Sequence, residues 1–143
     1  MSEISLDLSQ NEETSQAHFS RYGKHFQEKI FQALLTDHRW SSQMIEVMAP
    51  TFFELRYLTY LTSRYFAYFS KYRSFPTPQL LISIVRENLA DDNDLILKEQ
   101  VVEFLHRLRS NPDMGDQQYV KDKSLDFCKR QAFKEALEKS VEL

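Results

Sequence analysis

Glycine is nearly absent from this sequence, which holds only Gly23 and Gly115 in 143 residues. Two isolated glycines cannot build the loops GxxxxGK[ST] or GxGxxG that cradle phosphates, so the sequence argues against ATP hydrolysis by this segment. Proline occurs four times, and the single cysteine, Cys128, excludes an internal disulfide. Together with few alternating β-branched residues, the scarcity of glycine and proline predicts an all-α protein.

Other features of function are missing as well. The four histidines form no HExxH or HxxxH pair, and one cysteine cannot make a zinc-finger site, so we expect no metal or other cofactor in this segment. No apolar run approaches the roughly 18 residues of a transmembrane helix, and residues 1–10 lack the pattern of a signal peptide. We therefore expect a cytoplasmic protein without membrane contact. The net charge of −3 argues against a strongly nucleic-acid-binding domain.

What the sequence does have is a dense aromatic stretch at residues 51–78, with ten of the nineteen aromatic residues. Spacings of three and four among them predict a core helix. Thr51 and Glu54 suggest a capping box at its start. Pro76 and Pro78 end the helix, because each proline disfavours α geometry in the residue before it. Thr77 then suits the N-cap of the next helix.

Periodicity predicts the remaining helices and their order. A first amphipathic helix spans residues 22–36, a short one follows Ser41, and a helix from Pro78 to about Ala90 succeeds the aromatic one. A fifth, capped by an acid of residues 91–94, runs to about residue 109, and after a turn Asp116 can cap a last helix to the end of the sequence. We expect a disordered acidic tail (1–18), a compact helical head (19–92) and a helical hairpin whose last helix leads toward a linker (93–143).

The last helix has fewer apolar positions than the others, and acids and bases alternate around it. Two apolar stripes run along this helix. The first consists of Leu125, Cys128, Ala132 and Ala136, and the second, which drifts beside it, consists of Phe127, Phe133, Leu137 and Val141. Such a helix cannot bury a full face in its own small domain, so we expect it to meet another helix, in a hairpin or across a subunit boundary. The pattern runs to Leu143 without a stop signal, which suggests the front part of a longer protein.

Basic residues on this helix raise a nucleic-acid hypothesis. The side chains that could contact phosphates are those of Lys121, Lys123, Lys129, Arg130 and Lys134. The interleaved acids favour a solvated or subunit-facing helix instead.

Three strings, in this order, resemble the N-terminal domain of DnaB-type replicative helicases, especially the phage-encoded branch. They are FQEKIFQALLTDHRW, MAPTFFELRYLTYLTSRYFAYFSKYRSFPTPQLL and YVKDKSLDFCKRQAFKEALEKSVEL. The resemblance covers about residues 22–143. It implies a module without catalytic residues, which associates with itself, as a dimer or hexamer, into a collar on a hexameric ring and docks primase or a helicase loader.

In that family ATP and Mg²⁺ belong to a following motor domain that this sequence lacks, so DNA would be contacted only indirectly, in the cytosol of the host if a phage encodes the protein. The resemblance also implies a hairpin turn at residues 110–115. The candidate interface residues on its two sides are Val101, Leu105, Leu108, Leu125, Cys128, Ala132, Phe133 and Leu137. The alternative function is a free-standing helicase adaptor, a loader or inhibitor, with the same fold.

Overall fold

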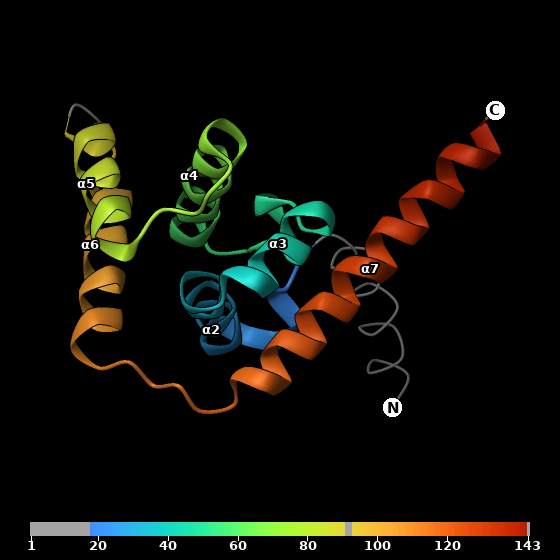
Figure 1. Cartoon of the computed structure of the whole chain (residues 1–143), viewed down its shortest axis with the longest axis horizontal. Helices are drawn as coiled ribbons and strands as arrows, with labels where there is room; N and C mark the ends of the chain where they lie inside the picture. Colours follow the sequence, from blue (N-terminus) through green and yellow to red (C-terminus); the bar gives the residue numbers. More distant parts are fainter. Residues whose placement is uncertain (1–17, 91–92, 143) are drawn as a thin grey trace, which may run out of the picture.

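The computed structural model describes residues 18–90 and 93–142, and all regular structure in these ranges is helical (Figure 1). The expected all-α class is thereby confirmed. The helices of these ranges are α2 (Gly23–Thr36), α3 (His38–Val47), α4 (Arg56–Tyr72), α5 (Pro78–Leu89), α6 (Leu95–Ser110) and α7 (Gln117–Glu142), with short 3-10 helices η1 (Ser20–Tyr22) and η2 (Pro50–Phe52). The tail expected over residues 1–18 lies outside the described residues, apart from His18.

Helix α2 is the centre of the molecule, since every residue from position 27 to position 34 is buried. Helices α3, α4 and α7 pack around it, while α5 and α6 pack on α4. One continuous apolar cluster takes in residues from all of these helices. Four of these buried residues, Gln27, Glu28, Lys29 and Gln32, are polar, and buried polar side chains require hydrogen-bond partners.

The aromatic helix α4 presents its apolar face to α2. Tyr65 is fully buried, and its hydroxyl donates to the Leu34 carbonyl over 2.6 Å. Its ring stacks on Phe75, with the centroids 4.8 Å apart. The expected core helix is therefore present, and Phe75 folds back from the segment after α4 to cover it.

The expected start of this helix is wrong. Thr51 lies in η2, and α4 begins only at Arg56, so Thr51 and Glu54 form no capping box. The Glu54 amide instead donates to the Gln27 side chain over 2.9 Å. Burial of Phe52 and Phe53 explains the difference, because an extended residue 53 places both rings in the core.

Of the N-caps expected for the other helices, two are confirmed and one is wrong. Thr77 caps α5 and Asp94 caps α6, as expected, each side chain accepting a hydrogen bond from the amide three residues later. Helix α3, however, begins at His38 and is capped by Asp37 rather than by Ser41. Ser41 lies inside α3, buried, and donates to the Leu34 carbonyl over 2.7 Å.

Helices α6 and α7 pack on different parts of the molecule. Helix α6 lies against α4, and α7 lies across α2 and α3 (Figure 1). The two predicted interface sets, residues 101–108 and residues 125–133, are therefore not brought face to face within one chain. The physical reason is that Phe127 of α7 packs instead against Phe19 and Phe52, in an aromatic cluster beside α2.

Candidate association surface

The first half of α7, residues 117–128, is named the root of α7 because it is packed into the fold. Val120, Ser124, Phe127 and Cys128 are all buried on one side of it. The Phe127 ring centroid lies 5.0 Å from that of Phe19, in a tilted contact, and 5.8 Å from that of Phe52, in an edge-to-face contact. Such aromatic packing anchors the root, because it buries a large apolar area and because tilted and edge-to-face ring pairs are themselves favourable.

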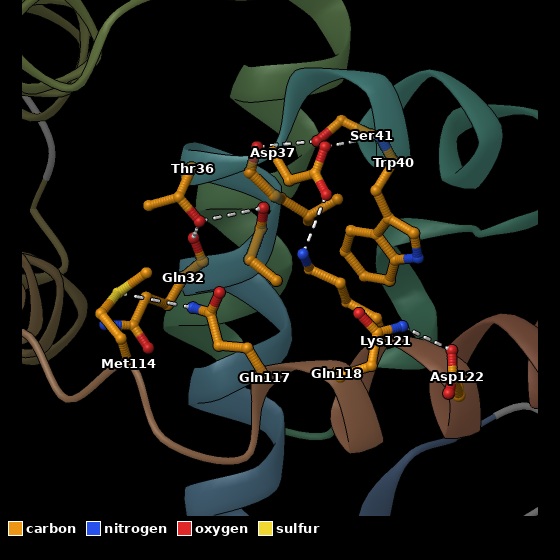
Figure 2. Close-up of polar contacts among 12 residues, drawn as sticks. Gln32, Thr36, Asp37, Trp40, Ser41, Met114, Gln117, Gln118, Lys121 and Asp122 are labelled. Atoms are coloured by element: carbon orange, nitrogen blue, oxygen red, sulfur yellow. Dashed lines mark hydrogen bonds and ion pairs between the residues drawn. The ribbon is translucent and has the colours of Figure 1, made fainter.

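An ion pair fixes the root to the start of α3. Lys121 Nζ lies 2.8 Å from Asp37 Oδ2, and Figure 2 shows this lysine reaching from α7 to the aspartate that also caps α3 through the Trp40 amide. The hydrogen bond from Lys121, followed by that from the Trp40 amide, holds the pKa of Asp37 below its usual value. One carboxylate thus joins two helices.

A second lysine holds the loop that leads into α7. Lys29 of α2 is 5% exposed, and its Nζ donates to the carbonyls of Asp113 and Gly115 over 2.9 Å and 2.6 Å. Beyond the loop, Gln118 bonds Asp122 on the outer side of α7 (Figure 2). Because loop and root are both tied to the body, the direction of α7 is set before its second half begins.

The second half of α7, residues 129–142, is named the arm because it extends beyond the body of the fold (Figure 1). Phe133 is 67% exposed, Leu137 51% and Val141 85%. Four-residue steps keep these three side chains on one side of the helix. Phe133 follows Cys128 by five residues, or roughly 140° around the helix at 3.6 residues per turn, so the apolar side of the arm differs from that of the root.

The second exposed apolar feature is a groove between α5 and α6. A cavity of about 210 Å³ opens there, beside α2 and the loop before α7. Its lining consists of Gln32, Leu35, Thr36, Pro78, Gln79, Leu81, Ile82, Leu105, Leu108, Arg109, Pro112 and Met114. Apolar side chains dominate this set, and we name it the α5–α6 groove.

The eight predicted interface residues are thus distributed over four environments. Val101 and Cys128 are fully buried in the core of this chain, and burial raises the pKa of the Cys128 thiol, as suits a packing residue. Leu105 and Leu108 line the α5–α6 groove, and Leu125 packs partly buried against the core. Exposed positions on the arm are Ala132, Phe133 and Leu137.

Sequence patterns missed a polar network beside α2. Glu28 accepts hydrogen bonds from Arg107 over 3.0 Å and 2.7 Å and from the Tyr57 hydroxyl over 2.6 Å. Burial acts to raise the pKa of Glu28, but these hydrogen bonds outweigh it and leave the pKa below its usual value. The partners lie 29 and 79 residues away, so hydrophobic periodicity carries no sign of them.

The basic positions of α7 are partly engaged. Lys121 pairs with Asp37, and Arg130 pairs with Asp126 one turn earlier over 3.2 Å. In the part of the chain that the structure describes, no three His, Cys, Asp or Glu side chains gather as a metal site would require. None of the described helices has the length and apolarity needed to cross a membrane.

Comparisons with known proteins returned no match, whether to protein-family models, to curated proteins or to solved structures.

Proposed function

We propose that this chain is a non-catalytic association domain that binds further copies of itself and a protein partner, as the N-terminal collar of a DnaB-type replicative helicase does. The observation that carries the proposal is the arm, whose exposed Phe133, Leu137 and Val141 share one side of a helix held rigidly at its root. Exposed apolar residues scattered singly are ordinary, whereas an aligned set on a projecting helix is typical of an interaction surface.

The energetic reasoning is direct. Burying a Phe or Leu side chain is worth about 1.5–3 kcal/mol, and none of this is gained while the arm stays in water. Helical structure continues along the arm although it packs little against its own chain, so binding would not have to order it first. A preorganised helix loses less conformational entropy on association, which favours binding.

The resemblance stated above supplies the biological setting of the proposal. In that setting the chain forms a dimer or hexamer collar, recruits primase or a helicase loader, and contacts DNA only indirectly. ATP and Mg²⁺ would act in a separate motor domain of the parent protein. The adaptor alternative shares the same arm, and it differs in binding a helicase ring without assembling by itself.

Light scattering across a concentration series tests the proposal. We expect the mass of the wild-type chain to rise with concentration, and a Phe133→Asp, Leu137→Asp variant to stay monomeric with an unchanged far-ultraviolet circular dichroism spectrum. Lys139→Asp is the matched control and should associate like the wild type, because Lys139 is exposed on the arm, lies roughly 120° or more around the helix from both Phe133 and Leu137, and its replacement changes the net charge by the same amount. A wild-type chain that stays monomeric at millimolar concentration and binds no primase from its own source contradicts the proposal. A monomer that binds the helicase ring supports the adaptor.

A further inference from the structure

The α5–α6 groove is an apolar surface that the described residues leave open. Leu105 and Leu108 of α6, Ile82 of α5 and Leu35 of α2 approach it from three helices, and Met114 borders it from the loop. Met114 is 50% exposed there. Such a site fits one or two large apolar side chains better than a polar ligand, because Arg109 is the single charged residue among the described residues that line it.

The arm of the same chain cannot fill this groove. Figure 1 shows α5 and α6 at one end of the molecule and the arm leaving at the other, with α2, α3 and α4 between them. Lys121 and Lys29 hold the root and its loop, so the arm cannot swing back across the body. Because the arm and the α5–α6 groove of one chain cannot reach each other, they can come into contact only between two chains.

We infer that the arm of one copy docks in the α5–α6 groove of a second copy, with Phe133 and Leu137 as the inserted side chains. These two residues are about 6 Å apart along the helix, at 1.5 Å per residue, a spacing that suits adjacent positions in one groove. The inference rests on the proposed function, and it adds the surface that receives the arm.

Charge supports this choice of occupant. Glu138 follows Leu137 on the arm and Arg109 lines the groove, and neither has an ion-pair partner among the described residues. Docking brings these opposite charges to the rim of one contact. Rim pairs of this kind contribute mainly to orientation and specificity.

The contact is also asymmetric, which determines what it builds. Each copy offers one arm and one groove, so the interface is heterologous and repeats until a ring closes or a filament grows. A stable interface buries about 800 Å² on each partner, whereas one exposed aromatic and two aliphatic side chains supply on the order of half of that. Single contacts are therefore weak, and assembly depends strongly on concentration.

A complementation experiment tests the inference in the whole chain. The arm variant is Phe133→Asp, Leu137→Asp, and the groove variant is Ile82→Asp, Met114→Asp, at two positions that are not buried. We expect each variant alone to be monomeric and their equimolar mixture to form 1:1 dimers and nothing larger, since one intact arm and one intact groove remain. Ser83→Asp on the exposed side of α5 is the control for the groove variant, and it assembles like the wild type.

Charge exchange gives a second measurement that avoids the apolar lining. Arg109→Glu and Glu138→Arg each weaken association, by roughly two- to fivefold as for exposed ion pairs, and both changes in one chain restore it. A groove variant that assembles like the wild type, or a mixture without dimers, overturns the inference but leaves self-association through the arm standing. A wild-type chain without any assembly overturns both.

Discussion

Root and arm belong to one continuous helix, and both contain large apolar side chains, but their surroundings are opposite. Phe127 in the root is 7% exposed and lies within ring contact of Phe19 and Phe52. Phe133, six residues later, is 67% exposed. The difference arises because the apolar side of α7 shifts around the helix at the boundary between the two halves. Apolar composition alone therefore does not separate a helix that completes a core from one that offers a surface.

The ion pairs of the two halves also differ, because one connects α7 to another helix and the other lies within α7. In the root, Lys121 reaches a different helix and meets a carboxylate that already caps α3. At the start of the arm, the one ion pair of Arg130 among the described residues is with Asp126 of its own helix, and both side chains are exposed. Pairs of the second kind contribute little to stability, because water screens them and two long side chains lose freedom. The root is thus packed and paired with the rest of the fold, whereas the arm extends from the root and packs little against the body.

The largest expected effect is that of Phe127→Ala. Removing this ring leaves a cavity among Phe19, Phe52 and Tyr22, and such substitutions cost about 3–5 kcal/mol of unfolding free energy. Urea denaturation followed by circular dichroism measures this loss. A change below 1 kcal/mol would show that the root is not anchored by the aromatic cluster.

Lys29→Met has the next largest effect. Methionine keeps most of the packed volume of the side chain but removes the donor to the Asp113 and Gly115 carbonyls, so we expect a loss of about 1–2 kcal/mol. The exposed Lys24 lies on the same helix, and Lys24→Met is the matched control with little effect. Equal unfolding free energies for the two variants would contradict the role of Lys29 in holding the loop.

Asp37→Asn isolates the ion pair of the root, because asparagine remains a good N-cap for α3. We expect a loss of up to about 1 kcal/mol at neutral pH, more than for Asp126→Asn at the exposed pair. The pKa of Asp37 is lower in the folded chain, so its ion pair stabilises the fold above the unfolded pKa of about 3.9, and this contribution is lost as the pH falls through the folded pKa. Unfolding measurements at pH 6 and pH 3 should show the difference between wild type and variant shrinking at the lower pH.

Phe133→Ala is expected to change stability least. At concentrations where the chain is monomeric, loss of an exposed ring changes the unfolding free energy by about 0.5 kcal/mol or less. The same denaturation measurement, beside Phe127→Ala, compares one substitution on two halves of one helix. A cost similar to that of Phe127→Ala would place Phe133 in the core of the monomer and remove the distinction between root and arm.

Local features of the fold were predictable from the sequence. Thr77 and Asp94 cap their helices as expected, because an N-cap needs only its own side chain and an amide three residues later. Thr51 and Ser41 offered the same local signal and took other roles. In both cases burial of neighbouring residues decided the outcome, and that depends on contacts made across the chain.

The candidate association surface was predictable only in part, because residue spacing is local whereas burial depends on contacts across the chain. An under-filled last helix with Phe133 and Leu137 on it was visible from residue spacing, and the structure leaves both side chains exposed. The sequence predicted Cys128 and Leu125 as interface residues on the same grounds, yet both pack against the helical head. Residue spacing gives the angle between two side chains around a helix axis, but not the side from which the rest of the chain approaches.

By itself, then, the sequence determined a helical protein with an aromatic core helix, since composition and the 3.6-residue period act over short distances. Only the tertiary structure decided that α7 leaves α6 and crosses α2 and α3. That outcome depends on Lys29, Lys121 and Phe127 finding partners distant in the sequence, at Gly115, Asp37 and Phe19. Long-range contacts of this kind set the direction of a helix, and here they separate its packed root from its exposed arm.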